Sequence, residues 1–162
     1  MLDAHESAQV SQLADIDTSS RGTRICVGRD SMIDSFVRIK CAGGTADVVI
    51  GERCFVNSGT VMYSGNGIRI GSDVLIAANC TIAPVNHAYQ SRETTIRQQG
   101  FLPGKGGIVI EDDVWIGAGC VLLDGAVIRR GAVVGAGSLV HGELAEYGVY
   151  AGTPLVRKGE RT

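Results

Sequence analysis

Two kinds of side chain in this chain could carry out covalent chemistry, the histidines and the cysteines. A histidine imidazole ordinarily titrates near neutral pH, so it can remove a proton from an attacking hydroxyl or amine. His5 lies in a polar N-terminal stretch and His141 near the last apolar residues, where we expect both to be exposed. His87, in "IAPVNHAYQ", stands where a regular spacing of aliphatic residues stops, and this position makes it the strongest candidate for a general base.

The five cysteines are odd in number and include no CxxC pair, which is typical of reduced thiols in a cytoplasm. Cys54, Cys80 and Cys120 each follow a regularly spaced aliphatic residue by four positions, so we expect small buried core residues rather than nucleophiles. Cys26 and Cys41 fall outside that pattern and receive no role. We predict no metal site, because zinc on such a scaffold would need three neighbouring histidines.

Aliphatic residues recur at intervals of six through most of the chain. They form four sets: Val27, Ile33, Ile39; Ile50, Val56, Met62; Ile70, Ile76, Ile82; and Ile110, Ile116, Leu122, Ile128, Val134, Val140. A period of six fits neither a strand, with period two, nor a helix, with period 3.6. It fits a short strand followed by a tight turn, with three such units making one coil of a triangular prism. The sequence therefore predicts an all-β, parallel β-helix fold.

The interruptions of this spacing indicate where function lies. Ile39 to Ile50 contains five residues too many, Met62 to Ile70 two, and Ile82 to Ile110 twenty-two. Each interruption follows the third unit of a coil, so all three should leave the prism at the same corner. Insertions that collect on one edge of a solenoid commonly build a binding face. We therefore predict an active-site loop over residues 83–107, with His87 in it.

Composition limits the remaining possibilities. A length of 162 residues is typical of one domain, which we divide into an irregular lead-in over 1–24, the coils, the loop and a C-terminal cap and tail over 144–162. The net charge of −2, with both signs interspersed, argues against binding nucleic acid. No apolar run is long enough to cross a membrane, and the N-terminus lacks the pattern of a signal peptide. We expect a cytoplasmic protein.

Beyond the spacing, "IGSDVLIAANCTIAPVNHAY" and "IVIEDDVWIGAGCVLLDGAVIRRGAVVGAGSLV", with the later "AGTP", resemble the hexapeptide-repeat acyltransferases. The resemblance extends over roughly residues 25–160 and is strongest for the galactoside, maltose, xenobiotic and surface-polysaccharide O-acetyltransferases. It implies a left-handed β-helix, a homotrimer with active sites between subunits, and acetyl-CoA as cosubstrate. It also implies direct transfer to a sugar or glycan hydroxyl.

The resemblance further implies roles for particular residues. His87 matches the catalytic base, Asn57 the acceptor-binding asparagine and Trp115 a pocket residue. Independently of the resemblance, the loop offers further candidates for acceptor binding, namely Tyr89, Arg92, Glu93 and Gln99. Residues expected to hold CoA are Gly117, Ala118, Gly135 and Ala136 for the pantetheine arm, and Arg157 and Lys158 for the phosphates. Asn57 has a second interpretation as a turn residue, because asparagine tolerates left-handed backbone.

Other functions stay open at this point. An amino-sugar nucleotide N-acetyltransferase would need the same base, and a non-catalytic β-helix scaffold would need none. A zinc enzyme of the carbonic anhydrase type lacks its histidines. The short polar segment 1–24 differs from the galactoside and maltose enzymes and favours the surface-polysaccharide branch, with a sugar nucleotide or lipid-linked glycan as acceptor. Leu155 and Val156 also depart from the family's ending.

Overall fold

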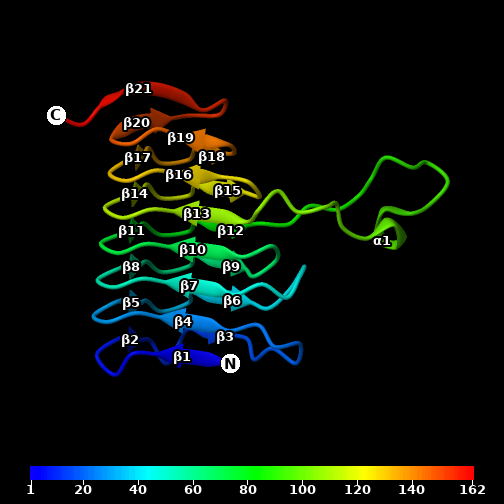
Figure 1. The fold of residues 1–162 in the computed structure, drawn as a ribbon, viewed down its shortest axis with the longest axis horizontal. Helices are drawn as coiled ribbons and strands as arrows, with labels where there is room; N and C mark the ends of the chain where they lie inside the picture. The colour runs from blue at the N-terminus through cyan, green and yellow to red at the C-terminus, as the bar shows by residue number, and fades with distance from the viewer.

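The computed structural model describes all 162 residues, and its regular elements are almost all short parallel strands, which tight turns join into a three-sided prism (Figure 1). The chain runs along sheet A, then sheet B, then sheet C, and returns to sheet A one coil further on. Seven strands stack in sheet A, one for each coil. The all-β, parallel β-helix prediction is confirmed.

Each face of the prism is one sheet. Sheet A contains β1 (Leu2–Ala4), β4 (Ile25–Val27), β7 (Val48–Ile50), β10 (Ile68–Ile70), β13 (Ile108–Ile110), β16 (Val127–Ile128) and β19 (Glu143–Leu144). Sheet B contains β2 (Gln9–Val10), β5 (Met32–Ile33), β8 (Phe55–Val56), β11 (Leu75–Ile76), β14 (Trp115–Ile116), β17 (Val133–Val134), β20 (Gly148–Ala151) and β21 (Val156–Glu160). Sheet C contains β3 (Asp15–Ile16), β6 (Arg38–Lys40), β9 (Val61–Tyr63), β12 (Thr81–Ala83), β15 (Val121–Leu123) and β18 (Leu139–Val140).

The core is built from the residues spaced by six. Strands stack in register, so that Ile50, Ile70 and Ile110 occupy equivalent positions on successive coils. They belong to a single cluster of 28 buried hydrophobic residues that fills the prism. Each large aliphatic side chain buried in this way stabilises the fold by roughly 1.5–3 kcal/mol.

Residues 1–24 contain a further coil, so the prediction of an irregular lead-in is wrong. β1, β2 and β3 pair with β4, β5 and β6, and they bring Ala4, Val10 and Ile16 into line with the next ladder. These three residues are themselves spaced by six. The pattern is faint because an end coil packs against one neighbour only, which leaves its side chains exposed or half-buried and its sequence polar.

The other end of the chain is also more ordered than predicted. β19 and β20 continue the prism, and β21 folds back antiparallel to β20. The predicted tail is therefore a strand that covers the last edge of sheet B. A covered edge protects backbone groups that would otherwise pair with another chain.

Two of the three corners keep strictly to the six-residue count. At the corners between sheets A and B and between sheets B and C, the third residue after the buried aliphatic one often has a positive φ, as in Asp73 (60°), Gly59 (74°) and Asn79 (60°). Asn57 is not among the residues with positive φ. Its interpretation as a left-handed turn residue is therefore wrong, because Gly59 takes that role in its corner.

The corner between sheets C and A, called here the C/A corner, carries all of the extra chain. The chain leaves it after β3, β6, β9 and β12 and returns at the next strand of sheet A, so the predicted shared corner is confirmed (Figure 1). The excursions pack on one another. A Cβ at Gly43 would lie 2.8 Å from Val85, and one at Gly65 would lie 2.7 Å from the Pro84 carbonyl.

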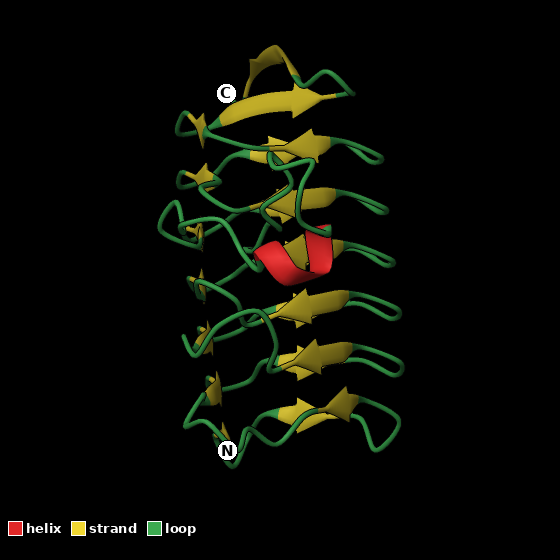
Figure 2. Cartoon of the chain, turned by 90° about the vertical axis from the view of Figure 1, so that its right-hand side faces the viewer, coloured by secondary structure: helices red, strands yellow, loops and turns green.

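The longest excursion, residues 84–107, projects away from the prism and includes the only helix, α1 (Ile96–Gln99) (Figures 1 and 2). Its bounds match the predicted loop to within a residue. No helix is long and apolar enough to cross a membrane.

Candidate active site

His87 is held on one of two antiparallel arms at the base of the long loop. Its backbone forms an isolated bridge with Phe101. On either side, the Ala88 N–H donates to the Gly100 carbonyl at 3.0 Å and the Leu102 N–H donates to the Asn86 carbonyl at 2.8 Å. The imidazole therefore stands on a short paired segment, and its exposed side chain points away from the core.

One contact determines which nitrogen of His87 is free. Nδ1 lies 3.2 Å from the Gly100 carbonyl oxygen. A carbonyl oxygen can only accept a hydrogen bond, so this contact requires a proton on Nδ1. In the neutral ring Nε2 then keeps its lone pair, which is the arrangement that a general base needs. The Phe101 ring, with centroids 4.6 Å apart, also restrains the imidazole.

A hollow of about 590 Å³ opens beside His87. Its lining residues come from both arms, from α1 and from β15: Asn86, His87, Tyr89, Ile96, Leu102, Lys105 and Leu123. Tyr89, predicted as an acceptor-binding residue, therefore lies in the same hollow as the predicted base. Tyr89 and Ile96 are 66% and 56% exposed, so they offer apolar surface to a ligand.

The return arm of the loop is tied to the prism by Asp124, which the sequence analysis did not single out. This carboxylate is only 5% exposed and accepts hydrogen bonds from the backbone N–H groups of Lys105 and Gly107 and from the Asn66 side chain. The sequence does contain an indication of this structural role of Asp124. Asp124 follows the ladder residue Leu122 by two positions, at the turn into sheet A, where a lone acid among aliphatic residues requires buried donors.

The corner between sheets B and C, called here the B/C corner, carries the other predicted binding residues. Asn57 follows β8, and Gly117, Ala118, Gly135 and Ala136 follow β14 and β17 at equivalent positions further along. The structure thus brings the predicted pantetheine residues together. A Cβ at Gly117 would lie 2.5 Å from the Ala136 nitrogen, which explains the glycine there. The Ala118 and Ala136 N–H groups have no acceptor in the chain, and both residues are exposed.

Within one chain, Asn57 and His87 do not meet. Asn57 lies where sheet B turns into sheet C, whereas the loop with His87 leaves where sheet C turns into sheet A. Sheet C separates the two corners. Asn57 is not among the residues that line the hollow beside His87.

Trp115 lies on the outer face of sheet B, away from both corners. It is 53% exposed, stacks in register between Leu75 and Val133, and Leu75 is itself 52% exposed. Together with Phe55, these side chains form an apolar stripe on the outside of the prism. Trp115 lines a separate hollow of about 300 Å³ and is not near His87 in the same chain.

The predicted phosphate contacts lie on β21. Arg157 pairs with Glu160 at 3.0 Å, so its charge is already partly neutralised, whereas Lys158 is exposed without a partner. These residues lie at the last coil, beyond Gly135 and Ala136 in the stack of sheet B.

The predicted burial of the three ladder cysteines is confirmed. Cys54, Cys80 and Cys120 are at most 3% exposed, and their thiols donate to backbone carbonyls such as Gly71 and Gly135. Burial raises the pKa of Cys54, and contact with the Cys120 thiol together with burial raises the pKa of Cys80. Thiols with a raised pKa are poor nucleophiles. Contact with the Cys80 thiol lowers the pKa of Cys120 to about 7, but Cys120 is fully buried. Cys41 is half-buried and burial raises its pKa as well.

Comparisons with known proteins agree with this architecture. Residues 107–142 match the family model described as bacterial transferase hexapeptide (six repeats), and residues 47–84 match hexapeptide repeat of succinyl-transferase. A putative acetyltransferase of Saccharomyces cerevisiae is 30% identical over 90% of this chain and 73% of its own length. The chain belongs to the hexapeptide-repeat acyltransferases.

Other relatives in this family are named for acetyl transfer to sugars. A galactoside O-acetyltransferase of Lactococcus lactis is 31% identical over 71% of this chain and 54% of its own length. A putative lipopolysaccharide biosynthesis O-acetyl transferase of Escherichia coli is 30% identical over 70% of this chain and 60% of its own. The chain thus spans little more than half the length of these two relatives.

A solved structure supports the fold over the whole chain. The N-acyltransferase AntD from Bacillus cereus, in complex with dTDP and coenzyme A, superposes with a TM-score of 0.81 at 21% identity. The match covers 99% of this chain and 83% of AntD. The fold is therefore a left-handed parallel β-helix, with the handedness that the family resemblance implied.

Proposed function

We propose that the protein is a cytoplasmic acetyl-CoA-dependent O-acetyltransferase that acts on a sugar hydroxyl in bacterial surface-polysaccharide biosynthesis. The contact of His87 Nδ1 with the Gly100 carbonyl carries the proposal, because it leaves Nε2 unprotonated and directed away from the arm that holds it. Membership of the hexapeptide-repeat acyltransferases and the names of two relatives support the reaction class.

The proposed reaction is a direct transfer. Nε2 of His87 accepts the proton of the sugar hydroxyl as its oxygen attacks the thioester carbonyl of acetyl-CoA. The tetrahedral intermediate collapses by breaking its C–S bond, and the CoA thiolate takes the proton from the imidazolium. No acyl-enzyme forms, because the buried thiols have no access to the donor.

The proposed active site needs two copies of the chain. His87 and Asn57 lie at different corners of one prism, so both can act on one acceptor only if the loop of one subunit reaches the B/C corner of the next. We infer a homotrimer that closes three such sites. The apolar stripe of Phe55, Leu75 and Trp115, and the exposed loop residues, supply surface for subunit contacts.

We place CoA along the B/C corner. The unpaired N–H groups of Ala118 and Ala136 can donate to the carbonyls of the pantetheine arm, while the glycines before them let the ligand approach the backbone. Lys158, at the last coil, is then placed to meet the phosphates, with Arg157 available once its pairing with Glu160 opens. Asn57 of the adjoining subunit would then face the acceptor.

The proposal is tested by measuring thiol release from acetyl-CoA with a panel of sugars, nucleotide sugars and oligosaccharides. Analytical ultracentrifugation measures the mass of the oligomer. We expect turnover with a hydroxyl acceptor and the mass of a trimer. Turnover with amino-sugar nucleotides alone would instead favour N-acetylation. If millimolar CoA leaves the melting temperature unchanged and no acceptor supports thiol release, a scaffold role is favoured.

A further inference from the structure

The hollow beside His87 contains one full charge. Apart from His87 its lining residues are the uncharged Asn86, Tyr89, Ile96, Leu102 and Leu123, and the single charged side chain is Lys105. The ammonium of Lys105 forms no ion pair and no hydrogen bond within the chain, in contrast to Lys40, which pairs with Asp17 at 3.0 Å. Lys105 is exposed at the lining of this otherwise uncharged hollow, and an ammonium without a partner in the chain is suited to an anionic group on a ligand.

The position of Lys105 is fixed by the prism rather than by the loop. Its N–H donates to Asp124 Oδ2 at 2.8 Å, and the Gly107 N–H donates to Oδ1 at 2.9 Å. The Asn66 amide, from the preceding excursion, donates to Oδ2 at 3.0 Å. A carboxylate that is 95% buried is costly unless several donors meet it, so these three bonds hold the arm firmly.

We propose that this hollow is the acceptor subsite for a sugar that carries a carboxylate or a phosphate. Lys105 pairs with the anionic group, Tyr89 and the aliphatic residues contact the sugar ring, and Asp124 is the positioning residue for Lys105. The inference rests on the proposed acetyl transfer, because it assigns the hollow to the acceptor of His87. It goes further in naming the charge of that acceptor.

Equilibrium binding tests the subsite without requiring turnover. Galactose, galacturonic acid and galactose 1-phosphate are titrated by NMR into the wild-type protein; the last two separate carboxylate from phosphate as the source of charge. We expect at least one acidic sugar to bind about fivefold or more tighter than galactose, which corresponds to a partly exposed ion pair. Lys105→Met should abolish that preference and Lys105→Arg should keep it. Equal binding of all three sugars, or a preference that survives Lys105→Met, would overturn the proposal.

Asp124→Asn tests the positioning role. The amide of asparagine presents donors where the Lys105, Gly107 and Asn66 groups also donate, so we expect hydrogen exchange at the Lys105 and Gly107 amides to accelerate at least tenfold. The preference for acidic sugars should fall as in Lys105→Met, although the lysine is still present. Asp124→Ser, which keeps one acceptor oxygen, serves where the asparagine variant does not fold. Unchanged exchange with an unchanged preference would remove Asp124 from this role.

Ser31→Ala provides a matched control for general loss of stability. Ser31 is fully buried and, like Asp124, bonds two segments: it donates to the Gly51 carbonyl and accepts from the Cys54 N–H, away from the C/A corner. Its variant should lower the melting temperature and leave sugar preference unchanged. Selective binding without thiol release would retain the subsite and reject acetyl transfer. Equal thiol release with all three sugars would retain acetyl transfer and reject the subsite.

Discussion

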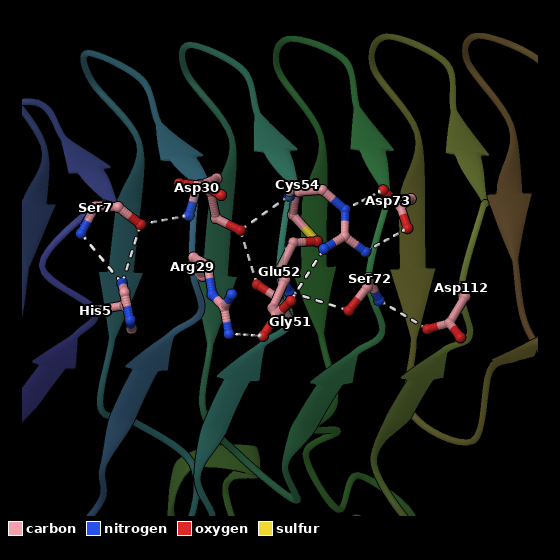
Figure 3. A network of polar contacts seen from close by, with 12 residues as sticks. His5, Ser7, Arg29, Asp30, Gly51, Glu52, Cys54, Ser72, Asp73 and Asp112 are labelled. Carbon is pink, nitrogen blue, oxygen red and sulfur yellow. Dashed lines mark hydrogen bonds and ion pairs between the residues drawn. The ribbon is translucent and has the colours of Figure 1, made fainter.

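The corner between sheets A and B, called here the A/B corner, and the C/A corner contain the same chain turning through the same angle, yet only one of them is free to vary. At the A/B corner each coil turns without extra residues, and side chains bond from coil to coil. Ser7 bonds the Asp30 N–H and Asp112 bonds the Ser72 N–H (Figure 3), and Arg53 bonds Asp73 in the same way. At the C/A corner the first two excursions add the same number of residues, the third adds fewer, and the fourth is by far the longest. Stacking therefore fixes the turns at two corners and leaves the third free to carry extra chain, including the loop with His87.

The two corners also use charge differently. Arg53 bonds Asp73 through two contacts at 2.7 and 2.9 Å, and hydrogen bonding to Arg53 lowers the pKa of Asp73, but both groups are exposed. Exposed pairs of this kind contribute little to stability, because solvent screens the two charges. Asp124 at the C/A corner is buried and holds backbone groups, so its loss should alter the shape of a loop and not only its charge.

The largest expected effect separates chemistry from folding. His87→Ala should lower kcat by about two to four decades, because the hydroxyl would lose its general base. The melting temperature should change little, since the side chain is exposed and outside the core. Initial rates of thiol release and a thermal melt measure the two quantities.

His141→Ala is the matched control, because His141 is an exposed histidine on the prism itself, away from the long loop. We expect wild-type kcat for this variant. A folded His87→Ala protein with more than a tenth of wild-type kcat would show that another group removes the proton.

The reverse effect is expected in the core. Leu122→Ala should reduce the free energy of unfolding by about 2–5 kcal/mol, because Leu122 is fully buried between Ile82 and Val140 and its removal leaves a cavity. Turnover per folded molecule should stay within about twofold. Denaturant unfolding, compared with Val121→Ala on the outer face of the same strand, measures the difference. Similar losses for the two variants would contradict the assignment of the inner face.

A third prediction concerns where the loop rejoins the prism. Gly106 and Gly107 both have positive φ, 103° and 82°, but a Cβ at Gly107 would lie 2.5 Å from the Gly67 carbonyl oxygen, whereas one at Gly106 meets nothing within 4 Å. Gly106→Ala should reduce the free energy of unfolding by about 1–2 kcal/mol, because alanine disfavours this backbone conformation. Gly107→Ala should cost more, because the clash adds to it. Denaturant unfolding of the two variants measures both losses of stability. Equal losses in the free energy of unfolding would show that the return arm shifts to accommodate the Cβ without strain.

The fold was predictable because each coil repeats the same packing problem. Ile70, Ile76 and Ile82 can be recognised by their spacing alone, since every coil buries the same positions. The first coil was missed because an end coil buries one side only, and Val10 and Ile16 stand there among polar residues. Spacing is informative only where burial is complete.

The site was predictable only in part. The position of His87 followed from the interruption of the repeat, but the hydrogen bond to Gly100 depends on how two loop arms pair, which no spacing indicates. Asp124, on a regular turn after β15, and Asn66, in the excursion after β9, meet across 58 residues of sequence. Contacts between irregular segments follow from the shape of each excursion and not from a repeating pattern.

The smallest expected effect lies on the regular side of the comparison. Glu111, directly after β13, accepts from Arg129 Nη1 at 2.8 Å and from the Arg130 N–H at 2.9 Å, and these two hydrogen bonds lower its pKa. Because the folded pKa lies below the unfolded one, the stabilisation is complete above the ordinary glutamate pKa of about 4.3 and is lost as pH falls through the lowered value. Glu111→Gln should therefore reduce the free energy of unfolding by less than about 1 kcal/mol at pH 7.

The same variant should also lose stability less steeply than the wild-type protein between about pH 5 and pH 3, since glutamine does not titrate. Urea unfolding across that range measures both slopes. The pairing of Glu111 with Arg129 implies a second feature. The difference in the free energy of unfolding between the two proteins should shrink in high salt, because exposed charges are screened. A constant difference from pH 7 to pH 3 would mean that Glu111 stabilises the corner through packing of its methylene groups, and not through its charge.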